Sequence, residues 1–96
     1  MCGAKAGGPE LAGVDVASET IIQGSVTRDG EPVNGYVRLL DEGGEFTAEV
    51  PTSATGQFRF FAAPGTWTLR ALVPGATVDR VVAAQQGAVA EVAIAV

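Results

Sequence analysis

Short runs in which apolar and polar residues alternate fill the chain from residue 19 onward. A side-chain period of two is the period of a β-strand, and runs of this length are too short for most helices. Turn residues such as Asp29-Gly30 and Pro64-Gly65 separate the runs, and Asp-Gly favours a tight hairpin turn. Seven strands are therefore expected, at residues 20–27, 35–41, 45–50, 57–61, 66–72, 77–83 and 88–96. This spacing predicts a seven-strand, immunoglobulin-like β-sandwich, whose strand order the period alone leaves open.

The alternation also predicts which side chains face the core, because successive residues of a strand point to opposite faces. The residues expected to face inward are Val26, Val37, Leu39, Phe46, Phe58, Phe60, Trp67, Leu69, Val92 and Ile94.

The 96 residues are enough for one domain. Residues 1–17 are rich in Gly, Ala and Pro and follow neither period, so we interpret them as a flexible N-terminal tail before a sandwich domain at residues 18–96. The sequence contains neither the roughly 7–15 apolar residues of a signal peptide nor the roughly 20 of a membrane helix. A cytoplasmic protein is therefore expected.

Charge and composition argue against several classes of function. Eleven acidic residues against six basic ones give a net charge of -5, which disfavours nucleic acid and anionic membranes as partners. With no histidine and one cysteine, the chain lacks a Ser-His-Asp triad, a Cys-His pair and a four-ligand zinc site of soft ligands. The single lysine, Lys5, lies in the tail, which excludes a Lys-Asn isopeptide bond inside the sandwich. We therefore expect a protein that is not an enzyme and has no cofactor.

Arginines and apolar residues share the outward parity of three expected strands. The outward residues are Arg38, Arg59 and Arg70, with Tyr36, Leu40, Phe61 and Leu72. If these strands are neighbours, they form one face of the composition typical of protein interfaces, and the same face could pair with itself in a homo-oligomer. The alternative is that Glu45 and Glu49 pair with the arginines across the sheet and leave an ordinary solvated surface.

Two further features carry chemistry of their own. Cys2 is the only thiol, and an exposed thiol near a positive α-amino group has a lowered pKa and more thiolate, which suits a sulfur acceptor. The competing interpretation is an incidental cysteine without an activating neighbour. Asp41, Glu42, Glu45 and Glu49 cluster near one turn, but without the ligand spacing of an EF-hand they indicate a solvated acidic loop rather than a Ca²⁺ site.

Several segments carry a resemblance to known families. Residues 24–26, 35–39, 56–60 and 64–69, above all the step Pro64-Gly65-Thr66-Trp67-Thr68-Leu69, resemble carboxypeptidase regulatory-like domains, which are transthyretin-like sandwiches. Over residues 1–96, including the Met1-Cys2 start and the segments 37–41, 45–50, 53–56, 58–63 and 68–72, the chain resembles more closely the SseC-like family of small actinobacterial proteins of unknown function. That resemblance implies an association with rhodanese-type thiosulfate sulfurtransferases, beside which such proteins tend to be encoded.

Two hypotheses of function follow. The first is a non-enzymatic interaction module in sulfur metabolism that docks on a sulfurtransferase through the arginine-containing face. The second is a persulfide carrier in which Cys2 accepts sulfur and the sandwich serves as a handle.

Overall fold

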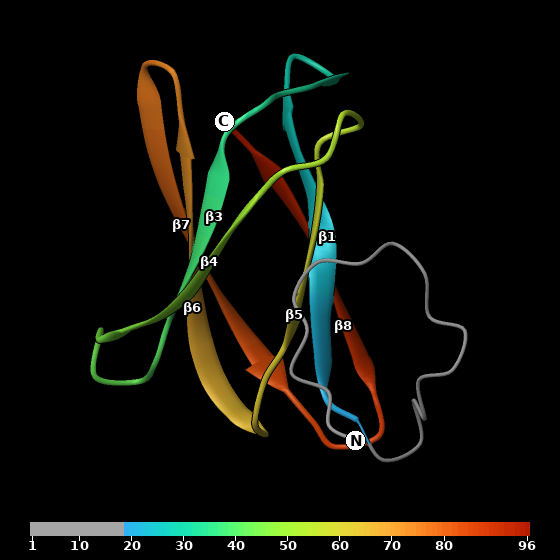
Figure 1. Cartoon of the computed structure of the whole chain (residues 1–96), viewed down its shortest axis with the longest axis vertical. Helices are drawn as coiled ribbons and strands as arrows, with labels where there is room; N and C mark the ends of the chain where they lie inside the picture. The colour runs from blue at the N-terminus through green and yellow to red at the C-terminus, as the bar shows by residue number, and fades with distance from the viewer. Residues whose placement is uncertain (1–18) are drawn as a thin grey trace.

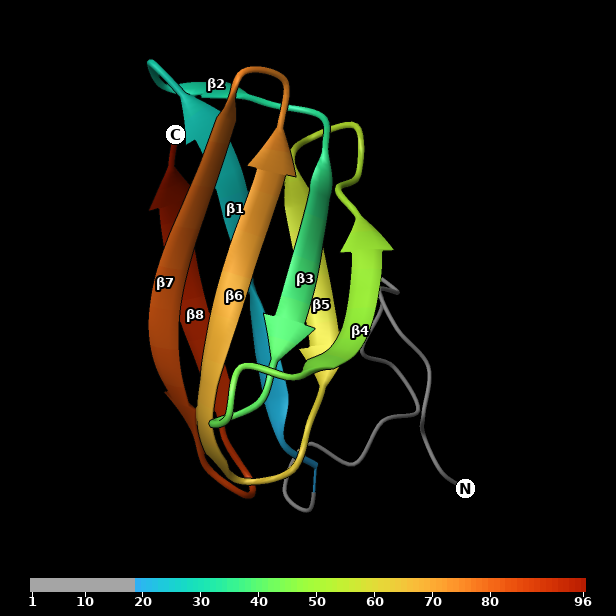
Figure 2. The same cartoon turned by 90° about the vertical axis from the view of Figure 1, so that its left-hand side faces the viewer.

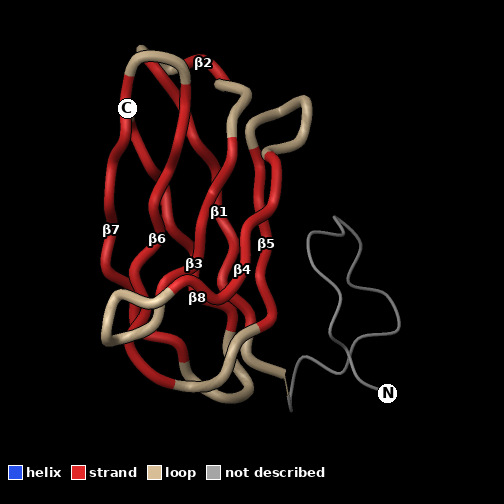
Figure 3. Tube along the Cα trace, turned by 60° about the vertical axis from the view of Figure 1, so that its left-hand side comes forward, coloured by secondary structure: helices blue, strands red, loops and turns tan. Residues whose placement is uncertain are grey.

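The computed structural model describes residues 19–96, which fold into two β-sheets packed face to face (Figure 1). The strands are β1 (Ile21–Arg28), β2 (Glu31–Pro32), β3 (Tyr36–Leu40), β4 (Phe46–Pro51), β5 (Gln57–Phe61), β6 (Gly65–Val73), β7 (Ala76–Ala84) and β8 (Val89–Ala95). The predicted all-β sandwich is confirmed, and each of the seven expected strands is present with both ends within one residue of the prediction. The described residues form strands and loops alone (Figure 3), and no helix among them is long and apolar enough to cross a membrane.

The two-residue strand β2 was not expected from the alternation. It follows the Asp29-Gly30 turn, where Asp29 has φ 53° and Gly30 has φ 83°. Positive φ at both central residues is the geometry of the hairpin turn that Asp-Gly favours, and it returns the chain along β1 with Arg28 opposite Glu31.

The first sheet, called sheet A, is built around β1. Along one edge of β1, residues 21–25 pair with β5 and residues 27–28 pair with β2, both in antiparallel orientation. The other edge of β1 pairs with β8 in parallel orientation. The second sheet, called sheet B, has the order β4-β3-β6-β7 and is antiparallel throughout. In Figure 2, β7 and β8 lie on one side of the sandwich, and β4 and β5 lie on the other. Strands that are close in sequence, such as β5 and β6, therefore belong to different sheets.

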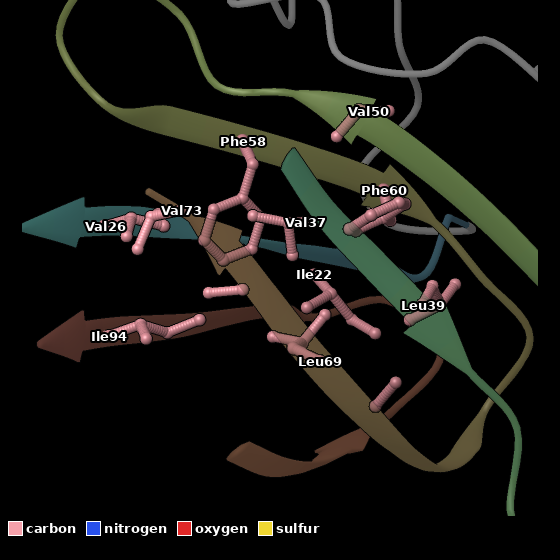
Figure 4. Packing of buried hydrophobic residues seen from close by; sticks show 12 residues of the cluster. Ile22, Val26, Val37, Leu39, Val50, Phe58, Phe60, Leu69, Val73 and Ile94 are labelled. Carbon is pink, nitrogen blue, oxygen red and sulfur yellow. The ribbon is translucent and has the colours of Figure 1, made fainter. Parts of the chain in front are cut away.

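The core lies between the two sheets. Figure 4 shows side chains of both sheets meeting there, with Phe58 and Ile22 on one side and Val37 and Leu69 on the other. Seven of the ten residues predicted to face inward are buried: Val26, Val37, Leu39, Phe58, Phe60, Leu69 and Ile94. Two more, Trp67 and Val92, are partly buried and pack against this cluster.

The tenth residue, Phe46, is a wrong prediction, because its side chain is 60% exposed. The cause is a β-bulge: β3 pairs Leu39 with Ala48 and then Leu40 with Phe46, so Thr47 is the extra residue on β4. One extra residue reverses the alternation beyond it and turns the Phe46 side chain to the outer face of sheet B. There it lies beside Leu40, which is 5% exposed and lies outside the inter-sheet cluster.

Candidate protein-docking face

The outer face of sheet B carries a row of four charged side chains, one from each strand. The registers place Glu49 opposite Arg38, Arg38 opposite Arg70, and Arg70 opposite Asp79. The row therefore reads acidic, basic, basic, acidic, and its two arginines lie side by side at the centre. Like charges on directly opposite residues are unfavourable, so each arginine needs its carboxylate partner on the outer side.

Arg70 and Asp79 form the better-defined ion pair. Arg70 Nε donates to Asp79 Oδ1 at 2.9 Å and Arg70 Nη2 donates to Oδ2 at 3.1 Å, a fork-to-fork arrangement. Hydrogen bonding from Arg70 holds the pKa of Asp79 below its usual value, and the same bonds raise the pKa of Arg70. The sequence analysis did not single out Asp79, although the sequence contains a signal for it. Arg70 and Asp79 lie four positions before and four positions after the Pro74-Gly75 turn, which sets them opposite one another.

Arg38 is held from two directions. Its Nη2 donates to Glu49 Oε2 at 3.2 Å, and its guanidinium carbon lies 5.5 Å from the centroid of the Phe46 ring. This distance is within the range of a cation–π interaction. Arg38 Nε is buried without a hydrogen-bond partner among the described residues. Glu45 and Glu49 were the partners suggested for the arginines by the sequence, and Glu49 is the one that bonds to Arg38.

Large apolar side chains flank the charged row on both sides. Tyr36 is 53% exposed on one side, beside Pro51 and Leu72 of the neighbouring strands. Phe46 on the other side is 60% exposed, and Val81 on β7 is 72% exposed. Among the described residues, the exposed large hydrophobic side chains are these three and Val89 of sheet A. Three of the four therefore gather on the outer face of sheet B.

We call this surface the docking face and define it by the following residues of sheet B: Tyr36, Arg38, Phe46, Glu49, Arg70, Leu72, Asp79 and Val81.

The structure does not bring all the predicted interface residues together. Tyr36, Arg38, Arg70 and Leu72 lie on the docking face, but Arg59 and Phe61 belong to β5 of sheet A. The condition that the three arginine strands be neighbours is therefore not met. Leu40 lies on the outer face of sheet B but is buried there, so it is not part of the docking face.

Arg59 belongs to a separate polar network on the outer face of sheet A. Its Nε donates to Gln23 Oε1 at 2.8 Å, and Gln23 Nε2 donates to Glu91 Oε2 at 2.6 Å. The network crosses β5, β1 and β8 and lines an open groove of about 630 Å³, which Ser53 and Thr55 also line. Arg59 is therefore a natural control residue for any test of the docking face.

The acidic turn is stabilised by its own backbone. Asp41 Oδ1 accepts hydrogen bonds from the N–H groups of Gly43 and Glu45, both at 2.9 Å. This is the local side-chain capping that Asp commonly provides in turns. In residues 19–96, no group of three or more acidic, His or Cys side chains is placed to hold a metal ion. Cys2 lies outside the described residues.

The fold and the docking face define a small β-sandwich in which the outer face of one sheet carries exposed apolar side chains and paired charges. Residues 2–96 match the model of a family described as a protein of unknown function, DUF1416, and the chain belongs to that family. Two uncharacterized proteins of Mycobacterium tuberculosis strain H37Rv are each 58% identical to it over 85 residues, which is 85% of either chain. An uncharacterized protein of Mycolicibacterium smegmatis is 65% identical over 63 residues, 64% of this chain and 70% of the relative.

Solved structures with similar folds are distant in sequence. The dioxygenase domain of a dioxygenase–carbohydrate-binding fusion protein from Streptomyces sp. SirexAA-E has a TM-score of 0.63 at 11% identity and covers 100% of this chain and 95% of that domain. The major pilin subunit BcpA of Bacillus cereus has a TM-score of 0.61 at 11% identity, over 80% of this chain and 28% of the pilin. At these identities the likeness extends to the fold alone.

Proposed function

We propose that this protein is a non-enzymatic interaction module that binds a partner protein through the docking face. The observation that carries the proposal is the gathering of Tyr36, Phe46 and Val81, three exposed large apolar side chains, around a neutralised row of charges. Exposed apolar side chains that gather on one face mark interaction sites, and aromatic and arginine side chains are enriched in protein interfaces.

We further propose that the partner is a rhodanese-type sulfurtransferase. The support for this part is the resemblance of the sequence to the SseC-like family, which associates such proteins with sulfur metabolism. The docking face and the identity of the partner therefore rest on different grounds, and one experiment can separate them.

The experiment is calorimetric titration of a purified rhodanese-type thiosulfate sulfurtransferase with the wild-type chain and three variants. Val81→Glu places a charge in the apolar part of the docking face and should weaken binding at least about tenfold, the loss of about 1.4 kcal/mol. Arg70→Ala and Arg59→Ala form a matched pair, since they remove one arginine from the outer face of each sheet. Arg70→Ala should weaken binding and Arg59→Ala should leave it unchanged.

The outcomes distinguish the two parts of the proposal. Binding that survives Val81→Glu, or that falls equally in the two arginine variants, contradicts the docking face. A wild-type chain that does not bind the sulfurtransferase contradicts the choice of partner and leaves the docking face to be tested on other proteins.

Sulfur carriage by Cys2 is the rival hypothesis, and it concerns a residue outside the described part of the chain. Intact-protein mass spectrometry after incubation with the sulfurtransferase and thiosulfate tests it directly. A gain of one sulfur atom that is lost in Cys2→Ser supports a carrier. An unchanged mass supports the interaction module alone.

A further inference from the structure

The four edges of the two sheets differ in how well they are protected against pairing with another strand. In sheet B, the edge strand β4 contains a bulge and ends at Pro51. The other edge strand, β7, carries the charged residue Arg80 at a position whose alternation points toward the core side, and Arg80 is exposed there. Bulges, prolines and inward-pointing charges are the usual protection of exposed edges. In sheet A, one edge is formed by β5, which is only five residues long, and by β2, which pairs with the end of β1 beyond β5.

Strand β8 has none of these protections. Its seven residues, Val89–Ala95, include one charged residue, Glu91, and no Pro, Gly or Lys. It pairs with β1 in an unbroken register from Val89 to Ala95, so it is regular over its whole length. Within residues 19–96, β1 is its only pairing partner. A long, regular and largely apolar edge of this kind is a template for another strand.

The hydrogen bonds to β1 show which backbone groups of β8 face the free edge. Ile21 N–H donates to Ala88 C=O, and Val96 N–H donates to Thr27 C=O. In a parallel ladder alternate residues point toward the partner strand, so the even-numbered residues of β8 bond to β1. The odd-numbered residues, Val89, Glu91, Ala93 and Ala95, then direct their N–H and C=O groups away from β1.

We propose that β8 pairs with β8 of a second copy of this chain, in antiparallel orientation, across a twofold axis at Val92. In this register Val89 lies opposite the partner's Ala95, and Glu91 lies opposite the partner's Ala93. Each of the four edge-facing residues then has a hydrogen-bonding partner, and sheet A continues from one copy into the other. A twofold axis makes the interface isologous, the commonest symmetry of soluble oligomers.

Charge and burial select this register over its neighbours. Moving the axis to Glu91 would place that carboxylate opposite the partner's Glu91, which is unfavourable. Moving it to Ala93 would place Val89 beyond the end of the partner's β8, whose last residue is Ala95. With the axis at Val92, the partly buried Val92 meets the partner's Val92 on the core side of the extended sheet, and the two Glu91 side chains are diagonal neighbours rather than directly opposite one another.

The test uses opposite charges at one exposed position. Ala93 is exposed and lies opposite Ser25 in the monomer, so substitution there leaves the core intact. Ala93→Glu places a carboxylate opposite the partner's Glu91, twice per dimer, and should weaken the dimer about two- to thirtyfold in Kd. Ala93→Lys should tighten it by a similar factor. The matched controls, Ala83→Glu and Ala83→Lys on the exposed side of β7, should leave Kd unchanged.

Sedimentation velocity over a range of concentrations gives the Kd, with a reducing agent present so that Cys2 forms no intermolecular disulfide. Circular dichroism confirms that each variant is folded. The expected result is a concentration-dependent dimer whose Kd moves in opposite directions in the two Ala93 variants. A monomer up to about 1 mM, for which the pairing would be weaker than about -4.1 kcal/mol, overturns the proposal. So does a dimer whose Kd is the same in both variants. Val81→Glu should leave the dimer intact, so the β8 dimer and the docking face are tested independently.

Discussion

Phe46 and Phe60 provide a direct test of the bulge in β4, because the alternation of the sequence predicts both side chains in the core and the structure places only one there. Phe60 is 2% exposed between the sheets, whereas Phe46 is 60% exposed beyond the bulge. Replacing each with alanine therefore removes the same atoms from a buried site and from an open one.

The structure sets the expected magnitudes. Loss of a buried phenylalanine costs about 3–5 kcal/mol, because the transfer free energy is lost and a cavity remains. With 60% of Phe46 exposed, roughly two fifths of its surface, about 60–100 Å², is removed from water. At about 25 cal/mol per Å² that burial is worth about 1.5–2.5 kcal/mol as an upper estimate, and an open site leaves no cavity. Phe46→Ala should therefore cost about 1–2 kcal/mol.

Urea unfolding followed by tryptophan fluorescence measures both free energies, since Trp67 is the only tryptophan. A domain of this size has a total stability of only about 4–12 kcal/mol, so Phe60→Ala can be too unstable to measure. Phe60→Leu and Phe46→Leu form a milder matched pair with the same expected order. Equal losses at the two positions would refute the bulge and return Phe46 to the core.

Two other predictions concern a close backbone contact and a pH dependence. A Cβ at Gly24 would overlap the carbonyl oxygen of Val92 on the adjoining strand and lie 3.1 Å from Phe58 Cζ, so Gly24→Ala should lower the free energy of unfolding by about 1–3 kcal/mol or more. The control Gly43→Ala, whose Cβ would meet only Asp41 Oδ1 at 3.5 Å, should stay within about 0.5 kcal/mol in the same urea assay. For the pH dependence, Arg70 lowers the pKa of Asp79 in the folded state. This pair therefore adds stability above the unfolded pKa of about 3.9 and loses it as pH falls through the folded value. Asp79→Asn should flatten the acid limb of a plot of stability against pH, and an unchanged acid limb would contradict the ion pair.

The strands were predictable because the evidence for them is local. The period of two and the turn residues lie within each segment, so all seven expected strands were placed to within one residue. The bulge at Thr47 was not predictable in this way, since one extra residue changes no composition and simply reverses the faces beyond it. Phe46 was therefore assigned to the wrong face by a rule that held for Phe58 and Phe60.

The candidate site was only partly predictable, for a topological reason. Parity says that Arg38, Arg59 and Arg70 point outward from their strands, but each sandwich has two outer faces. Which face a residue occupies depends on the order of the strands, and β5 joins β1 rather than β3. The Arg70–Asp79 ion pair could have been predicted from the sequence, because the Pro74-Gly75 turn fixes the register of β6 and β7 and so sets Arg70 opposite Asp79.

The neutralised charges of the docking face also indicate what kind of attraction it can offer. Glu49 and Asp79 balance Arg38 and Arg70, so the row carries no net charge to draw an oppositely charged partner from a distance. Exposed ion pairs of this sort contribute little on their own, whereas apolar area contributes in proportion to its burial. Binding should therefore depend more on Val81, Phe46 and Tyr36 than on the arginines, and it should change little with ionic strength. The arginines act chiefly within the face itself, since each already donates to a carboxylate of its own sheet, Arg38 to Glu49 and Arg70 to Asp79.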